Sequence, residues 1–176
     1  MILEETLNKL IRDIVNLLLL SPGYTIKSKP NHRRPTGSYG DVQFMSDISV
    51  GTEQRVFENN IGDEDITENI TGMRQIMFSV GFYRDNARDN ARSVRTRLIR
   101  ESIQSIFRSA NVGLTSRSEV RELSEPLENG WEERSQFDIL LSVIGSDSDV
   151  VSSINSVYIS GRFESNLISV PIEISI

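Results

Sequence analysis

Apolar side chains along the first twenty residues recur at spacings of three and four, the period of one face of an α-helix. The positions on that face are Leu3, Leu7, Leu10, Ile11, Ile14 and Leu18. Ser21-Pro22-Gly23 ends the pattern, because proline cannot continue a helix and glycine tolerates a turn. The sequence therefore predicts an amphipathic helix over residues 2–20, followed by a polar loop over residues 24–40.

Alternation of apolar and polar positions, the period of a β-strand, begins after that loop. It predicts strands over residues 42–50, 70–84, 112–122, 131–143, 153–163 and 167–176. Residues 51–69 carry a net charge of −5, since six acidic side chains stand against Arg55 alone. This acidic connection makes the first two strands a long antiparallel hairpin. Gly145–Asp149, rich in glycine, serine and aspartate, predicts a turn.

A second helix is predicted over residues 85–110, with Asp85-Asn86 as its N-terminal cap. Its apolar stripe steps sideways near Leu98–Ile99, so the helix either bends there or is covered over a wide face. A second face carries Arg84, Arg88, Arg92 and Arg95. The expected fold is α+β, with the N-terminal helix and one long central helix packed on a mainly antiparallel sheet. We expect one domain over residues 1–163 and a β-rich extension over residues 164–176.

Composition argues against most enzyme classes. The 176 residues include no cysteine and a single histidine, His32, which excludes disulfides, thiolate catalysis and sites with several histidines. No phosphate-binding, dinucleotide-binding or serine-nucleophile motif is present. We therefore expect no enzymatic activity, cofactor or metal. A small hydrolase with two convergent carboxylates stays open, because any two acids can meet in a fold.

Charge and hydropathy restrict the classes of partner and the location that we expect for the protein. The net charge is −6, which does not favour nucleic acid over the whole surface. Arginine provides 16 of the 19 basic residues, and arginine is enriched at protein interfaces. The arginine face thus pairs with acids of a neighbouring element or subunit; the alternative is a nucleic-acid-binding α+β module that also uses Arg33 and Arg34. The acidic N-terminus and the short apolar run Leu17–Leu20 predict a soluble, cytoplasmically made protein without a membrane segment.

The most individual stretch is Val120–Ser124, followed by Gly130–Ile139, in which Trp131-Glu-Glu-Arg134 opens an alternating strand. This stretch resembles the phage neck terminator (tail terminator) family. The N-terminal helix, the strand near residues 42–50, the segment I-T-G-x-R-x-x-x-F-S-V at residues 70–80 and the arginine-rich helix stand in the family's order. The resemblance covers roughly residues 1–163.

The resemblance implies a non-enzymatic structural protein of the virion, assembled in the bacterial cytoplasm and located at the head–tail junction. It implies a homo-oligomeric ring, usually a hexamer, that caps the tail tube and sheath. The ring would dock the tail to the connector or head-completion protein beneath the capsid. Genomic DNA would pass through the lumen without specific binding.

Four groups of residues are candidates for contacts in such a ring. They are the arginines Arg88, Arg92 and Arg95; the motif residues Trp131, Glu132 and Arg134; the acids Glu53, Asp63, Glu64 and Asp65; and Ile172 and Ile174. The acids are expected to face the lumen or an adjacent protomer. Two alternatives stay open: Trp131 begins a core strand beside an exposed Glu132–Arg134 pair, and the C-terminal strand folds back on its own sheet instead of acting as an assembly arm.

Overall fold

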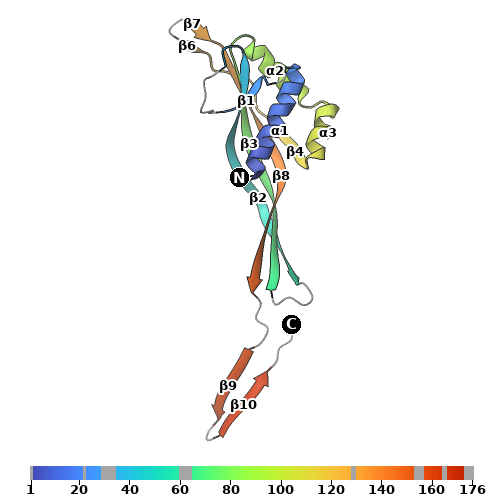
Figure 1. Cartoon of the computed structure of the whole chain (residues 1–176), viewed down its shortest axis with the longest axis vertical. Coiled ribbons are helices and arrows are strands. Elements are labelled where there is room, and N and C mark those ends of the chain that lie inside the picture. The colour runs from blue at the N-terminus through green and yellow to red at the C-terminus, as the bar shows by residue number, and fades with distance from the viewer. Residues whose placement is uncertain are drawn as a thin grey trace. The chain divides into compact units, whose positions relative to one another are not determined.

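The computed structural model describes residues 2–21, 23–28, 35–59, 65–127, 130–152, 157–163 and 166–172 (Figure 1). The elements in chain order are α1 (Ile2–Leu19), β1 (Thr25–Lys27), β2 (Tyr39–Asn59), β3 (Asp65–Tyr83), α2 (Ala87–Arg97), α3 (Glu101–Ser109), β4 (Val112–Arg117), β5 (Arg121–Glu122), β6 (Glu125–Leu127), β7 (Gly130–Glu132), β8 (Arg134–Ser152), β9 (Val157–Phe163) and β10 (Asn166–Ile172). The α+β class predicted from the sequence is confirmed. In the described part of the chain, no helix is both long and apolar enough to span a bilayer.

The main sheet has the order β1-β2-β3-β8-β4, and β5 also pairs with β8. β1 runs parallel to β2, whereas β4 and β5 run antiparallel to β8. The Arg74 guanidinium meets Asp47 across β2 and β3 at 2.7 Å, and Gly81 lies beside Gly40. The partners of successive β2 residues have falling residue numbers on β3. The two strands therefore form the predicted antiparallel hairpin.

The chain divides into two compact units, which are residues 1–51 with 73–144 and residues 52–72 with 145–176. In the first unit, three helices lie along the sheet (Figure 1). Their apolar faces and alternate strand positions form one core, since Leu7, Ile11, Ile14, Val42, Ile76, Phe78, Val80, Phe82, Ala91, Val94, Phe107, Phe137, Ile139 and Leu141 are all at most 2% exposed. The predicted periodicities of residues 2–20 and 70–84 are therefore confirmed.

The second unit combines the continuing strands with a separate hairpin. Arg55 pairs with Glu68 at 3.6 Å between β2 and β3, and Ser148 Oγ donates to Asn69 Oδ1 at 2.7 Å between β8 and β3. β9 and β10 pair antiparallel in a two-stranded sheet of their own. Over its described residues, β10 lies outside the main sheet, as expected for a C-terminal arm. Residues 173–176 lie outside the described part of the chain.

Three local predictions were wrong. The predicted turn Gly145–Asp149 lies within β8, because pairing with β3 continues there and overrides the local turn preference. The predicted loop over residues 24–40 contains β1, which hydrogen-bonds to the start of β2. The single central helix is two helices, since Arg100 adopts extended backbone angles between them (φ −62°, ψ 142°). The sideways step of the apolar stripe marks this break, where Leu98 is buried and Ile99 is exposed.

Candidate assembly surface

Trp131 stands on the outside of the short β6–β7 hairpin, which projects beyond the sheet in Figure 1. Its side chain is 76% exposed, so the alternative in which Trp131 begins a core strand is wrong. The reason is a break at Glu133, between β7 and β8. From Ser135 to Val143 the odd-numbered positions face the core, whereas before the break Glu132 points inward and Trp131 points to solvent.

Glu132 is only 6% exposed and lies between two arginines. Arg134 donates from Nε to Glu132 Oε2 at 2.8 Å, and Arg84 donates from Nε to Oε1 at 3.4 Å. Arg134 also reaches Glu125 at 2.8 Å. Burial raises the pKa of Glu132, but hydrogen bonds and charges from Arg134 and Arg84 outweigh it, so the pKa lies below its ordinary value. The expected Glu132–Arg134 pair thus forms, but in a buried network.

Two stacked tyrosines support these arginines. The rings of Tyr39 and Tyr83 lie 4.6 Å apart and 7° from parallel. The Arg84 guanidinium carbon lies 5.8 Å from the Tyr39 ring centre, and that of Arg134 lies 5.4 Å from the Tyr83 ring centre. Burial and the nearby Asp41 carboxylate raise the pKa of Tyr83 to about 12. Tyr83 therefore stays neutral. The two stacked rings lie against the arginines that bind Glu132.

Arg84 joins this network to the rest of the unit. It has a left-handed backbone conformation (φ 67°), and its guanidinium donates to the carbonyls of Pro35 and Gly37. Its amide donates to the Glu133 carbonyl at 2.7 Å. Arg84 therefore precedes α2 and does not belong to the predicted four-arginine helical face.

The start of α2 is capped from the β7–β8 junction and not by its own sequence. Asn86 occupies the cap position with φ 63° but makes no side-chain hydrogen bond there, so the predicted capping by Asp85-Asn86 side chains is wrong. Glu133 instead accepts a hydrogen bond from the Arg88 amide, at 3.0 Å from Oε1. A carboxylate at this place stabilises the first turn of the helix. The residue after Trp131-Glu132 thus ties the hairpin to α2.

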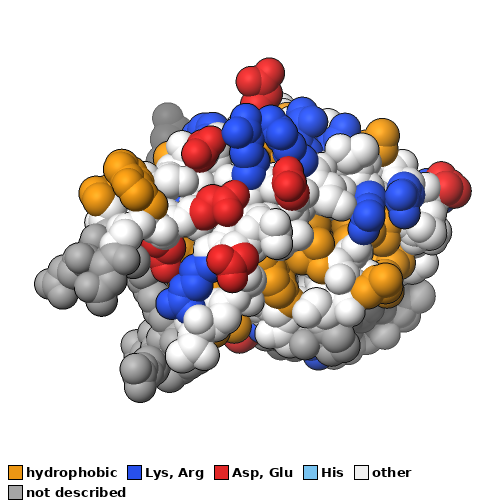
Figure 2. Space-filling view, turned by 90° about the horizontal axis from the view of Figure 1, so that it is seen from above, with side chains coloured by type: hydrophobic (Ala, Val, Ile, Leu, Met, Phe, Trp, Pro, Cys, Tyr) orange, Lys and Arg blue, Asp and Glu red, His pale blue; other side chains and the backbone are white. Residues whose placement is uncertain are grey.

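The three candidate arginines of α2 have different surroundings. Arg88 pairs with Glu122 at 3.6 Å, Arg95 donates to the Ser118 carbonyl at 2.6 Å, and Arg92 is exposed. Figure 2 shows basic side chains gathered on one face, with acidic side chains beside them. Arg92 and Arg95 line a polar hollow of about 300 Å³. Arg88 and Arg95 thus both have partners within the chain.

The other candidates lie elsewhere. Glu53 is an exposed residue of β2 in the second unit, with Gly72 beside its side chain. Asp65 begins β3 and Ile172 ends β10. The structure describes the backbone of these two residues but not their side chains. Asp63, Glu64 and Ile174 lie outside the described residues. The structure therefore brings Trp131, Glu132, Arg134 and Arg88 together around the β7–β8 junction.

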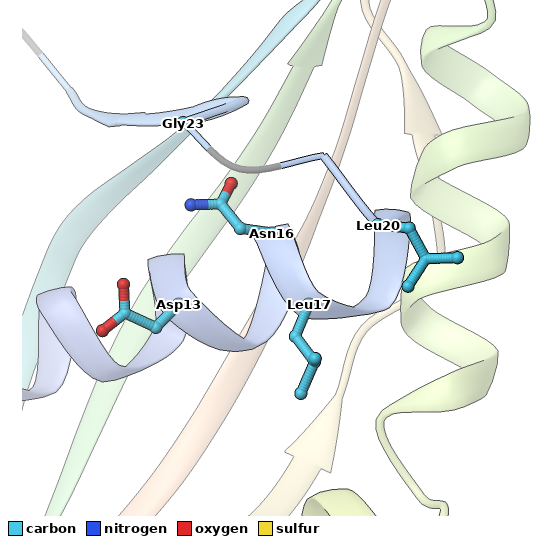
Figure 3. A pocket seen from close by; sticks show the side chains of 5 residues that line it. All are labelled: Asp13, Asn16, Leu17, Leu20 and Gly23. Atoms are coloured by element: carbon cyan, nitrogen blue, oxygen red, sulfur yellow. The ribbon is translucent and has the colours of Figure 1, made fainter.

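Some residues of this surface were missed. Tyr39 and Tyr83 belong to no motif, and Glu133 lies within the motif Trp131-Glu-Glu-Arg134 without being named as a candidate. The roles of all three depend on contacts between segments far apart in sequence. An apolar hollow of about 520 Å³ also lies at the end of α1, lined by Leu17 and Leu20 together with Asp13, Asn16 and Gly23 (Figure 3). The run of four leucines at residues 17–20 was the one sequence feature that indicated this hollow. Four consecutive residues point in different directions around a helix, so one buried face cannot take all four leucines.

Two further observations bear on function. Within the described ranges, no three histidine or acidic side chains lie close enough together to hold a metal ion. A family model described as phage neck terminator protein matches residues 5–166, nearly the whole chain. No curated protein matches the chain.

Proposed function

Because the chain belongs to the phage neck terminator family and is thus a structural protein of the phage neck, we propose that it forms a ring at the head–tail junction. In this proposal six copies cap the tail tube and sheath and join them to the connector or head-completion protein. The ring assembles in the host cytoplasm and becomes part of the virion, without catalytic activity.

The observation that carries the proposal concerns β2 and β8. These two become the outer strands of the sheet where β1 and β4 end. β1 pairs with β2 only up to Val42, and β4 pairs with β8 only up to Val143. Beyond these points the outer strands carry large exposed apolar side chains, which are Met45, Ile48, Val56 and Phe57 on β2 and Ile144, Val150 and Val151 on β8. Long apolar strand edges favour pairing with another chain. Contacts with further copies of the protein would cover these strands.

The β9–β10 hairpin supports an assembly arm. An isolated two-stranded hairpin is at best marginally stable in water, and β9 and β10 pair only with each other over their described residues. In the proposal, residues 164–176 act with β9 as an arm that joins the sheet edge of a neighbouring protomer, with Ile172 and Ile174 in the contact. Main-chain hydrogen bonds would supply much of the affinity.

The acidic hairpin supports a lumen through which DNA passes. Residues 51–69 carry a net charge of −5, and their described part forms the far ends of β2 and β3. We place Glu53, Asp63, Glu64 and Asp65 toward the lumen or an adjacent protomer. Six copies would bring about 30 negative charges together, which would repel DNA phosphates and keep the genome from binding.

Native mass spectrometry and negative-stain imaging of the purified protein test this proposal. A particle with the mass of six chains and a central hole is the expected result. Antibody labelling of virions should decorate the head–tail junction alone. Labelling of the capsid or the distal tail, or a chain that is absent from virions, would contradict the proposed position.

A further inference from the structure

We propose that the C-terminal hairpin joins a neighbouring protomer through β9, and that β9 pairs with the part of the neighbour's β8 that extends beyond Val143. This contact rests on the proposed function, in which the hairpin is an assembly arm, and it names the strand that bonds and the edge that receives it. Over the described residues, β9 and β10 pair only with each other, and β8 has no partner beyond Val143 on the side of β4. The same chain therefore carries a hairpin without a sheet and a sheet edge without a strand.

The register of the hairpin determines which of its main-chain groups point outward. In an antiparallel ladder, pairs that exchange two hydrogen bonds alternate with pairs whose N–H and C=O groups point away from the partner strand. Pro171 lies opposite Tyr158 and has no N–H to exchange, so this pair is of the outward-pointing kind. The alternation gives two further outward-pointing pairs, which are Ser160 with Ser169 and Arg162 with Leu167.

The two edges of the hairpin consequently differ. Every outward-pointing residue of β9 has an N–H to donate, whereas the outer edge of β10 lacks the N–H of Pro171. Within sheets, proline is confined largely to edges that face solvent, because it cannot donate to a neighbouring strand. β10 is therefore suited to end a sheet, and β9 is the strand that can add to another sheet by main-chain hydrogen bonds.

The open part of β8 suits such a strand in length and regularity. It runs over residues 144–152 and is thus slightly longer than the seven residues of β9. None of its residues has a positive φ. The open part of β2 instead contains Gly51, whose φ of 80° is left-handed and interrupts the regular row of main-chain groups. The regular edge of β8 is therefore the better partner for an added strand.

Charge and connectivity separate the possible occupants of this edge. Residues 144–152 contain Asp147 and Asp149 and no basic side chain, so two β8 edges placed side by side would bring like charges together. β9 contains Arg162 and no acid. Because β9 does not pair with β8 of its own chain, the occupant is β9 of a second copy. A contact between two different surfaces of identical chains is head-to-tail, and such contacts close into rings when the rotation permits.

The first test is a matched pair of proline substitutions at Ser160 and Ser169, which lie directly opposite each other. Ser160→Pro removes an outward N–H from β9, and Ser169→Pro removes one from β10. Pro171 shows that the hairpin tolerates proline at such a position. Ser160→Pro should raise the concentration needed for ring formation about tenfold or more, whereas Ser169→Pro should assemble like the wild-type chain, as measured by native mass spectrometry. Normal assembly of Ser160→Pro, or loss of assembly in Ser169→Pro, would overturn the inference.

The second test locates the receiving edge and uses the absence of native cysteine. Because β9 is only slightly shorter than the open part of β8, its central residue Ser160 would lie within one residue of Ser148 in either strand direction. Assembled mixtures of Ser160→Cys chains with Asp147→Cys or Ser148→Cys chains, treated with a short bismaleimide, should give covalent dimers. Mixtures of Ser160→Cys chains with Ser49→Cys or Val50→Cys chains, on the open part of β2, should not.

The outcomes of this second test separate the inference from the proposed function. Rings that give no dimers with the β8 variants, or that give them with the β2 variants instead, would overturn the inference and leave the proposed ring intact. A chain that carries both Ser160→Cys and Ser148→Cys and links only within itself would show that the hairpin folds back on its own sheet, which also overturns the inference. Failure of the wild-type chain to form rings at any concentration would instead contradict the proposed function.

Discussion

The strands β2, β3 and β8 each have one part in the first unit and one part in the second, and the two parts have different surroundings. In the first unit, Val42 on β2 and Phe78 on β3 are fully buried beneath the helices. In the second unit, Phe57 on β2 is 61% exposed and Val150 on β8 is 63% exposed. In the first unit the helices cover one face of these strands, whereas no described large apolar strand side chain of the second unit is buried. We therefore expect the first unit to be the folding core, and we propose that the second unit contacts other chains.

Two phenylalanines offer the strongest test of this difference. Phe78→Ala should lower the free energy of unfolding by about 3–5 kcal/mol, because it leaves a cavity in the core. Phe57→Ala should change it by less than about 1 kcal/mol while weakening assembly. Urea denaturation measures the first effect, and native mass spectrometry measures the second. Equal losses of stability from the two substitutions would refute the comparison.

Two glutamates provide a second contrast. Glu132→Gln should cost roughly 3 kcal/mol of unfolding free energy, because Arg84 and Arg134 lose a buried ionised partner. Glu58→Gln, on the exposed part of β2, should have little effect. Thermal and urea unfolding of both variants would check this. A loss as large for Glu58→Gln as for Glu132→Gln would contradict the contrast between the exposed and the buried glutamate.

The pH dependence follows from the lowered pKa of Glu132. The folded-state pKa of Glu132 lies below the pKa of a glutamate in the unfolded chain. Ionised Glu132 therefore stabilises the fold fully at pH values above that unfolded-state pKa. This contribution disappears as the pH falls through the folded-state pKa. The wild-type protein should therefore lose more stability on acidification than Glu132→Gln, measured by urea unfolding at a series of pH values below about 5. Parallel pH curves would contradict this.

Charge reversal on α2 should affect assembly more than folding. Arg88→Glu combined with Arg92→Glu removes one surface ion pair and should cost no more than about 1 kcal/mol. It should nevertheless impair ring or tail assembly, because we propose that these arginines meet acids of another chain. Arg95 is left unchanged, since it donates to the Ser118 carbonyl within the fold. Normal assembly of the double variant, followed by native mass spectrometry, would rule out this contact.

Removal of residues 167–176 should have the smallest effect on the monomer. β10 pairs with β9 and contributes nothing to the described core. The shortened chain should keep its melting temperature and lose only the β9–β10 part of its circular dichroism signal, but it should no longer form rings or join tails. A shortened chain that unfolds would show that this segment belongs to the protein's own core.

The parts of the fold that local sequence determines were predictable. The helical spacing of Leu7, Ile11 and Ile14 and the alternation of Ile76 and Phe78 each require only one buried face, and the structure confirms both. The paired acidic hairpin was also visible, because two alternating runs flank one polar connection. These features depend on periods of two and 3.6 residues, which a single sequence displays directly.

The assembly surface was only partly predictable. The motif Trp131-Glu-Glu-Arg134 was recognised, but the orientation of Trp131 depends on the break at Glu133. That break is stabilised by Arg84 and Arg88, some 45 residues away in sequence. Likewise, the turn expected at residues 145–149 does not form, since β3 supplies hydrogen-bond partners that local preference ignores. Contacts distant in sequence decided each of these features.

Hydrogen exchange in assembled and monomeric protein tests most directly whether other chains cover the outer strands. Outward-facing amides of β2 beyond Val42 and of β8 beyond Val143 should exchange rapidly in the monomer and become protected in the ring. Core amides of α1 and of β3 near Phe78 should exchange slowly in both states. Rapid exchange along both outer strands in an assembled ring would contradict the account.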